Sequence, residues 1–309
     1  MFRIGIVGAG RICAAHEKAI REHPEASLVA VADLDVEKAR QVAEPHGAAV
    51  YADYKQMAAQ TPMDAVILNL PHFLHCEATI FFLEAGIHVL VEKPMANSVE
   101  ECDRMLAAAA RTGKKLAVGH VQKYYGALRQ IRQMVEDGRY GKLCMITETR
   151  NLDYVTGRPK WFLTKKLAGG GIVMNFGAHS IDRLLYTTGL EVENIHGVLT
   201  NPVTDDDADV NAQFLVQLTG GVSAAVTLCG CYVPWEYEIS YYFTHGAVKV
   251  RDGSQLLVHE DGQYVNYGGS DDLIGCQLAE FIKLLKGEEN EMTTGEYGKQ
   301  VISVLSKIL

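Results

Sequence analysis

The stretch Ile4-Gly5-Ile6-Val7-Gly8-Ala9-Gly10-Arg11-Ile12-Cys13 decides the fold. It opens as a short apolar run of the length of a buried strand, and two glycines follow at once. Gly8 permits a tight turn, and Gly10, which has no Cβ, lets the backbone approach a phosphate closely. A strand, a glycine turn and a helix start in this order predict a phosphate cradle. Arg11 and Ile12 are counted with the expected cofactor-binding residues. Cys13 replaces the usual third glycine, and its thiol is small enough for close helix packing.

A carboxylate further along the chain completes this pattern. Asp33 ends a second apolar run 23 residues after Gly10, where an acid accepts hydrogen bonds from an adenosine ribose. A 2′-phosphate would meet a like charge there, and no Arg follows Asp33 directly, so the sequence favours NAD over NADP. A glycine turn in a similar fold that binds no nucleotide is the alternative.

The first third of the chain alternates short apolar runs with helical patterns, which is typical of βαβ units and a parallel sheet covered on both faces. A capping box at Ser98 and Glu101, with Gly113 beyond the far end, predicts a helix over 99–111. The expected strands are 3–7, 28–32, 65–69, 88–91 and 116–119.

The pattern changes after about residue 122 to one helix, reaching to 136, and then longer alternating strands. Gly220-Gly221 and Asp261-Gly262 are two-residue hairpin signals, so we expect a largely antiparallel sheet. The chain therefore divides into a dinucleotide-binding Rossmann domain, 1–121, with a doubly wound parallel sheet, and an α/β domain with an open, mostly antiparallel sheet, 122–309. The expected later elements are strands 143–150, 211–218, 222–228, 237–244 and 256–259 and helices 273–286 and 296–308.

Composition narrows the class of protein. Of 309 residues, 48% are hydrophobic and 22% charged, which is typical of a globular chain with two cores. The net charge is −9 without blocks of like charge, so we expect no nucleic-acid partner. The start of the chain lacks the basic and apolar regions of a signal peptide, and no apolar stretch is long enough to cross a membrane. Seven scattered cysteines predict reduced thiols in a cytoplasmic protein, and the pair Cys229 and Cys231 lacks the spacing of a metal site.

A charged pair, Glu92-Lys93, follows an apolar run at the expected carboxyl end of a parallel strand, where ligands bind in open α/β sheets. An ammonium there suits stabilisation of an alkoxide as hydride leaves its carbon. A strand-end lysine that merely reaches solvent is the alternative. Pro94 restricts Lys93 to an extended backbone, and a cis bond between them is possible.

A second cluster of polar residues follows Gly169-Gly170-Gly171, which suggests a flexible loop leading into a helix. Asn175, His179 and Asp182 are spaced i, i+4 and i+7 and are expected on one face of that helix. His179 titrates near neutrality and suits removal of a hydroxyl proton. A structural histidine is the alternative.

Several of these motifs jointly resemble the Gfo/Idh/MocA family of NAD(P)-dependent oxidoreductases, over essentially the whole chain. The resemblance implies NAD- or NADP-dependent oxidation or reduction of sugars, inositols or similar polyols, in a dimer or tetramer formed through the C-terminal sheet. It implies Lys93 and His179 as the catalytic pair. With it we add Leu70, His75, Glu92 and Lys93 to the expected cofactor contacts. The matching pieces are GIVGAGRI (5–12), ADLD (32–35), AGIHVLVEKP (85–94), GGGIVMNFGAHSID (169–182) and LAEFIKLLKGEE (278–289).

The sequence also departs from the family pattern. Asn175 stands where many members carry Asp, and an amide orients a neighbour but supplies no charge to stabilise an imidazolium. His72 replaces a frequent asparagine, and Gln122-Lys123-Tyr124 replaces a segment that is often richer in arginine. We nevertheless count Asn175 with the catalytic residues.

The sequence-based hypothesis is that His179 takes the hydroxyl proton while Lys93 supports the charge and hydride moves to the nicotinamide. Two rivals remain: an NAD-binding regulatory protein without turnover, and an enzyme whose bound NAD transiently oxidises a sugar to allow elimination or glycoside cleavage. The expected substrate contacts are Lys93, Lys123, Tyr124, Tyr154, Arg158, Trp161, Asn175 and His179, for which loop packing is the alternative.

Overall fold

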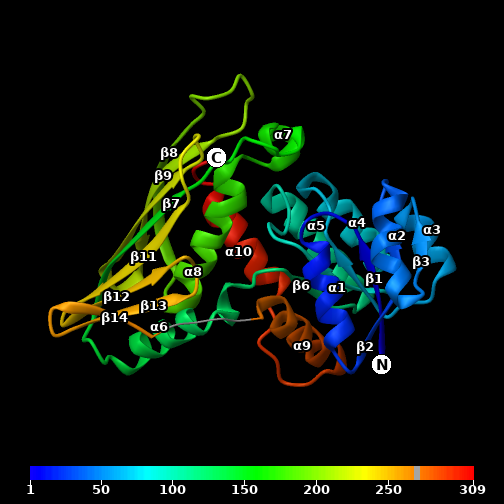
Figure 1. Ribbon diagram of the computed structural model, residues 1–309, viewed down its shortest axis with the longest axis horizontal. Coiled ribbons are helices and arrows are strands. Elements are labelled where there is room, and N and C mark those ends of the chain that lie inside the picture. The colour runs from blue at the N-terminus through cyan, green and yellow to red at the C-terminus, as the bar shows by residue number, and fades with distance from the viewer. Residues whose placement is uncertain (268–271) are drawn as a thin grey trace. The chain divides into compact units, whose positions relative to one another are not determined.

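The computed structural model describes residues 1–267 and 272–309, and within them the chain forms two compact units, each with its own sheet (Figure 1). The first unit comprises 1–120 and 272–300, and the second comprises 121–271 and 301–309. The sequence analysis places residues 272–300 in the second domain, but they pack with the first unit. The helix Leu273–Lys286 (α9) lies against Cys13–Glu22 (α1), and Leu278, Phe281 and Ile282 join the core that contains Ile4.

The first unit is a doubly wound Rossmann fold. Its six-stranded parallel sheet has the order β3-β2-β1-β4-β5-β6, which reverses direction beside β1, and helices cover both faces (Figure 1). The strands are β1 (Phe2–Val7), β2 (Ala26–Ala32), β3 (Ala49–Tyr51), β4 (Ala65–Leu68), β5 (His88–Val91) and β6 (Leu116–Val118). The other helices are α2 (Val36–Ala43), α3 (Tyr54–Gln60), α4 (His72–Glu84), α5 (Val99–Thr112) and α10 (Gly295–Leu305), the last of which ends in the second unit.

Local sequence explains why these elements start and stop where they do. Every residue of β4 is buried, as the continuous apolar run predicts for a central parallel strand. At the start of α5 the Ser98 hydroxyl accepts a hydrogen bond from the Glu101 backbone N–H, and Gly113 ends the helix at φ 67°. The sequence analysis missed strand β3 because its three residues are only half-buried and show no clear alternation of apolar and polar residues.

The second unit contains an eight-stranded sheet in the order β14-β13-β12-β11-β7-β10-β9-β8, and only the β7–β10 pair within it is parallel. The expected open, mostly antiparallel sheet is confirmed. The strands are β7 (Leu143–Asn151), β8 (Val192–Thr200), β9 (Asn211–Leu218), β10 (Val222–Cys229), β11 (Glu236–Phe243), β12 (Gly246–Arg251), β13 (Gln255–Glu260) and β14 (Gln263–Asn266).

Helices α6 (Gly126–Asp137) and α8 (Ala178–Thr188) pack against each other in the second unit, and α8 lies along one face of the sheet (Figure 1). The helix α7 (Lys165–Ala168) is a single turn. Both predicted hairpins are present: Gly220 and Gly221 have φ of 75° and 80°, and Asp261 and Gly262 have φ of 47° and 81°. The edge strand β8 was missed because most of its residues are exposed on both faces.

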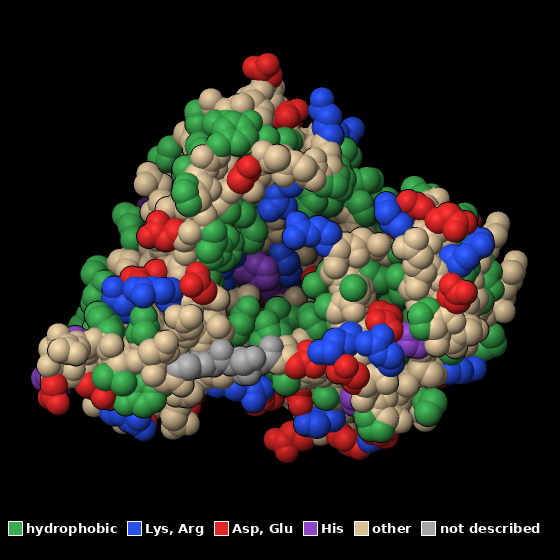
Figure 2. Space-filling view, viewed as in Figure 1, with side chains coloured by type: hydrophobic (Ala, Val, Ile, Leu, Met, Phe, Trp, Pro, Cys, Tyr) green, Lys and Arg blue, Asp and Glu red, His purple; other side chains and the backbone are tan. Residues whose placement is uncertain are grey.

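Charged side chains of both signs are interspersed over the face seen in Figure 2. All seven cysteines lie in the described part of the chain, where none forms a disulfide. No described helix is both long and apolar enough to cross a membrane.

Candidate functional site

The glycine turn after β1 has the form that a phosphate cradle requires. Gly8 has φ 97°, and a Cβ there would lie 2.5 Å from the backbone oxygen of Asn69, so only glycine fits. A Cβ on Gly10 would meet no atom within 4 Å. Gly10 therefore faces open space, and internal packing does not require its small size, so the turn leaves room for a ligand near its backbone.

Asp33 is held in place at the end of β2. Its Oδ2 accepts a hydrogen bond of 2.6 Å from the Ala9 N–H, and its Oδ1 accepts one of 2.8 Å from the Asp35 N–H. The carboxylate thus lies beside the glycine turn, as the sequence spacing predicts. The next residue, Leu34, is 91% exposed and uncharged, whereas the ammonium of Lys38 interacts electrostatically with Asp33.

The side chain of Asn69 was missed by sequence reasoning. Asn69 directly follows β4, next to Gly8. Within the described residues neither its amide nitrogen nor its amide oxygen has a hydrogen-bond partner, although both atoms are buried. Such groups carry a desolvation penalty of about 1–3 kcal/mol unless a ligand or water satisfies them. A polar residue at the carboxyl end of a central parallel strand was the signal in the sequence.

These features fit a dinucleotide. An open Gly10, an anchored Asp33 and an unsatisfied Asn69 amide offer backbone N–H groups for phosphate, an acceptor for ribose and a second polar contact. Arg11 and Ile12 are exposed at the end of the turn. Cys13 begins α1 and is 1% exposed, and burial raises the pKa of its thiol to about 12, so it acts as a packing residue.

His75, on α4, connects two loops. Its Nδ1 lies 2.8 Å from the Pro94 carbonyl oxygen and its Nε2 lies 2.8 Å from the Leu70 carbonyl oxygen. Burial lowers the pKa of His75, and the two carbonyls only partly oppose this. His75 therefore fixes the backbone of Leu70 and of the segment after Lys93, and His72 is also buried on this helix.

Glu92 and Lys93 follow β5, and both are half-buried. The Glu92 carboxylate lies 2.9 Å from Nε2 of His16 on α1 and accepts a hydrogen bond of 3.2 Å from the Lys93 N–H. Burial would raise the pKa of Glu92, but the hydrogen bond and charge of His16 and the ammonium of Lys93 lower it overall. The Lys93–Pro94 bond is cis, an outcome that the sequence left open. His16 was missed by sequence analysis.

In the second unit, Asn175 lies in a π-helical turn (Val173–Gly177), and α8 begins only at Ala178. The expected regular helix through Asn175, His179 and Asp182 is therefore wrong at its first turn. Wide turns of this kind occur often at functional sites. Asn175 and Asp182 are buried, and His179 is half-buried.

The glycines before this turn are packed and clamped, so the expected flexible loop is also wrong. Oδ1 of Asp209 accepts a hydrogen bond of 2.7 Å from the Gly171 N–H, and Oδ2 accepts one of 2.8 Å from the Val173 N–H. A Cβ on Gly171 would lie 1.8 Å from the Asp209 backbone oxygen. Burial raises the pKa of Asp209, and its backbone hydrogen bonds only partly oppose that shift.

A buried polar chain leads from the sheet to His179. Arg183 on α8 forms an ion pair with Glu148 on β7, and its Nη1 donates a hydrogen bond of 2.8 Å to Oε1 of Gln122. The amide nitrogen of Gln122 lies 3.3 Å from Nδ1 of His179. Burial alone would lower the pKa of the Arg183 guanidinium, but the charge of Glu148 and other neighbours raises it overall.

The expected substrate contacts lie in different environments. Trp161 is half-buried and stacks on Phe162 with ring centres 3.8 Å apart, and Lys123 is also half-buried. Tyr154 has no exposed surface, and the Arg158 guanidinium lies 4.1 Å from its ring centre. A direct contact between Tyr154 and substrate would require its neighbours to move. Tyr124 is 3% exposed, so its contact with a substrate would also require its neighbours to move.

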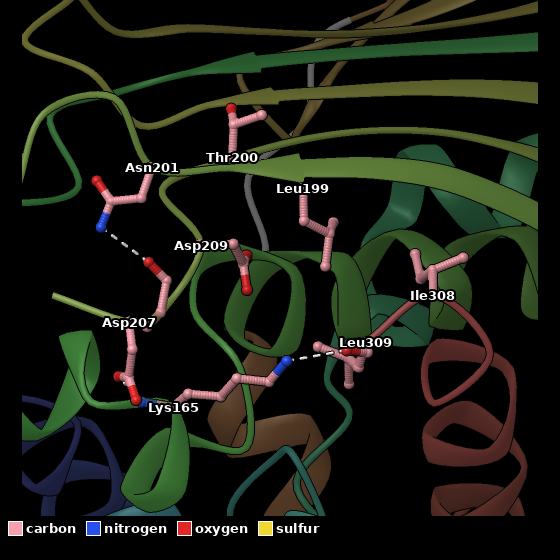
Figure 3. A pocket seen from close by; sticks show the side chains of 9 residues that line it. Lys165, Leu199, Thr200, Asn201, Asp207, Asp209, Ile308 and Leu309 are labelled. Carbon is pink, nitrogen blue, oxygen red and sulfur yellow. Dashed lines mark hydrogen bonds between the residues drawn. The ribbon is translucent and has the colours of Figure 1, made fainter.

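A pocket of ≈ 370 Å³ opens in the second unit beside Lys165, Asp207 and Asp209, and none of its lining residues belongs to the expected site (Figure 3). The Lys165 Nζ donates to the Leu309 carbonyl oxygen at 2.9 Å, and the Lys165 N–H donates to Asp207. Asp209, which lines the pocket, also binds the backbone N–H groups of Gly171 and Val173 before the π turn. No cluster of three or more metal-binding side chains occurs among the described residues.

Comparisons with known proteins place the chain in a family. Residues 2–120 match the model "Oxidoreductase family, NAD-binding Rossmann fold", and residues 128–249 match the model "GFO/IDH/MocA C-terminal domain". The chain belongs to the Gfo/Idh/MocA family of oxidoreductases, and its first unit contains the family's NAD-binding Rossmann domain.

Two curated relatives and one solved structure illustrate the range of similarity. The chain is 30% identical to 1-carboxy-3-chloro-3,4-dihydroxycyclohexa-1,5-diene dehydrogenase of Comamonas testosteroni, over 74% of this chain and 58% of that protein. It is 34% identical to D-glucoside 3-dehydrogenase of Escherichia coli, over 60% and 54%. These alignments span little more than half of either relative. The WlbA dehydrogenase of Bordetella pertussis, solved with NADH and UDP-GlcNAcA, has 26% identity and a TM-score of 0.86, over 99% of this chain and 95% of that one.

Proposed function

We propose that the protein is an NAD-dependent dehydrogenase or reductase that transfers a hydride between nicotinamide and a hydroxyl-bearing carbon of a sugar, inositol or similar polyol. One observation carries the proposal: the chain has both family domains and keeps Lys93 at the carboxyl end of β5 and His179 at the first turn of α8. The relatives named above support the substrate class, because their names refer to a glucoside and a dihydroxylated ring, and the solved one binds UDP-GlcNAcA.

The proposed cofactor contacts are the glycine turn, Asp33 and the two strand-end segments at Leu70 and Glu92, to which Asn69 is added. Backbone N–H groups after Gly8 and Gly10 hold the pyrophosphate, and Asp33 accepts the ribose hydroxyls. The anchored carboxylate of Asp33 supports NAD over NADP, because a 2′-phosphate would meet a like charge there. A bound dinucleotide supplies the hydride acceptor.

Lys93 and His179 are the proposed catalytic residues: an amine and an imidazole can each handle a hydroxyl proton or stabilise negative charge on an oxygen. Asn175 positions the turn that precedes His179, and Lys123 and Trp161 offer polar and aromatic surface for a hydroxylated substrate. Tyr154 is fully buried, and its ring packs against Phe162, on which Trp161 stacks. Assembly into a dimer or tetramer through the second unit's sheet, and a cytoplasmic location, remain predictions.

The direct test is a screen of sugars, inositols, sugar acids and 3-oxo sugars, in which NADH or NADPH absorbance is followed with purified protein. We expect turnover with at least one polyol and higher kcat/KM for NAD than for NADP. The Lys93→Ala variant serves as the control for contaminating dehydrogenases. Tight NAD binding without turnover of any compound would contradict the proposal and favour the regulatory role. Product formation without net NADH would favour transient oxidation.

A further inference from the structure

Gln122 has a side chain whose two ends contact different groups on α8. It begins a 3-10 turn (Gln122–Tyr124) and is 6% exposed. Its oxygen end faces Arg183, and its nitrogen end faces His179. Both contacts lie within the second unit.

The orientation of this amide follows from the chemistry of its partner. A guanidinium has only donors, so the atom that Arg183 Nη1 contacts at 2.8 Å must be the oxygen of Gln122. Arg183 is itself fixed: it is 1% exposed, and its Nη2 donates to Glu148 and, at 3.3 Å, to the Ser180 hydroxyl. Turning the amide over would place NH₂ against guanidinium in a buried site, which leaves two donors unsatisfied.

The fixed amide decides which nitrogen of His179 carries the proton. The NH₂ group of Gln122 donates and cannot accept, and it lies 3.3 Å from Nδ1 of His179. Nδ1 must therefore present its lone pair. A neutral imidazole has one ring proton, so that proton is on Nε2.

We propose that Gln122 is a positioning residue that holds His179 in the Nε2–H form, so that His179 donates a hydrogen bond to the substrate oxygen and does not take its proton. This inference rests on the proposed dehydrogenase function. It reverses the roles expected from the sequence, where His179 is the base. Asn175 agrees with it, because an amide one turn before His179 supplies no charge for an imidazolium.

The roles in the reaction then follow. A bound dinucleotide would supply the acceptor for the hydride of the substrate carbon. Lys93, after releasing the proton of its ammonium to solvent, would take the hydroxyl proton as the carbonyl forms. His179 keeps its Nε2–H throughout and stabilises the negative charge that develops on the oxygen. In the reverse direction the Lys93 ammonium returns the proton.

Nitrogen-15 NMR of imidazole-labelled protein at about pH 8 tests the tautomer without any substrate. The His179→Gln variant assigns the His179 signals among the 11 histidines. We expect an unprotonated Nδ1 and a protonated Nε2. In Gln122→Glu the new carboxylate accepts a hydrogen bond from Nδ1–H, so the Nδ1 signal should move to the protonated range. A protonated Nδ1 in the unmodified protein would overturn the proposal.

Kinetics provide the second readout. Gln122→Glu should lower kcat about 10²-fold with little change in KM, because a misplaced ring proton removes a transition-state contact. Gln130→Glu adds the same charge at an exposed site on α6 and should leave kcat unchanged. If Gln122→Glu does not fold, Gln122→Met replaces it: this side chain cannot donate, and the Nδ1 and Nε2 shifts should approach each other. Unchanged shifts and unchanged kcat would contradict the proposal.

These experiments separate the inference from the function on which it rests. If His179 carries its proton on Nε2 but the protein turns over no polyol, the proposed dehydrogenase function is refuted. The proposal that Gln122 sets the tautomer of His179 then still stands. Turnover by a protein whose His179 carries its proton on Nδ1 would refute the inference alone.

Discussion

The two units build their candidate sites by different means. In the first unit, Gly8, Asp33, Asn69 and Lys93 each follow a parallel strand, and the strand order brings these carboxyl ends to one edge. In the second unit, His179 depends on a π turn, a clamped glycine segment and a buried amide from a distant turn. The first arrangement reads directly from local sequence, whereas the second needs contacts between residues 35 to 61 positions apart.

The largest expected effect comes from removing the reactive group of either unit. Lys93→Ala and His179→Ala should each lower kcat at least about 10²-fold, because each removes a group that handles proton or charge in the transition state. NAD affinity, measured by fluorescence titration, should stay nearly unchanged. If either variant keeps full turnover, the chemistry does not draw on both units.

A pair of glycine substitutions sharpens the comparison. Gly171→Ala forces a Cβ to 1.8 Å from the Asp209 backbone oxygen, so the second unit should lose about 1–3 kcal/mol of unfolding free energy or more. Gly10→Ala meets no atom within 4 Å and should leave unfolding free energy nearly unchanged while weakening NAD binding. Denaturant unfolding and NAD titration of both variants check this. Equal loss of stability in the two would contradict the contrast.

Asp33 tests whether cofactor choice resides in the first unit alone. Asp33→Ser removes the charged acceptor, and a hydrogen bond to a charged group contributes about 1.5–3 kcal/mol, so kcat/KM for NAD should fall roughly 10- to 100-fold. The value for NADP should fall less or rise, because the like charge is gone. Steady-state kinetics with both cofactors measure the ratio. Asp35→Ser, two residues away, is the matched control.

The smallest effect concerns acid stability of the first unit. The pKa of Glu92 is lowered on folding, so its carboxylate stabilises the folded protein above its unfolded pKa, and that contribution is lost as pH falls through the lower folded pKa. Glu92→Gln should therefore show a shallower loss of unfolding free energy between about pH 5 and pH 3. An identical pH dependence in both proteins would show that the Glu92–His16 contact does not contribute.

Sequence reasoning identified most of the first unit because each of its signals is local. The glycine turn, Asp33 and the helix α5 lie where their motifs predict. Asn69 and His16 were missed, because their relevance appears only when β4 meets the glycine turn and α1 meets the end of β5. The edge strands β3 and β8 were missed because neither has a buried face with a clear period.

The sequence by itself determined the two domains' fold classes and the glycine turn with its acidic partner. Lys93 and His179 as catalytic residues are a prediction that the family resemblance implies. Hydrophobic periodicity, glycine placement and short motifs are each defined by residues close together in the sequence. The fold classes and the glycine turn can therefore be predicted without the tertiary structure. Only the tertiary structure decided that Gly171 is packed against Asp209, that Asn175 lies in a π turn, and that Gln122 faces Nδ1 of His179. The direction of an amide is set by a buried ion pair between a helix and a strand, and no local pattern in the chain records it.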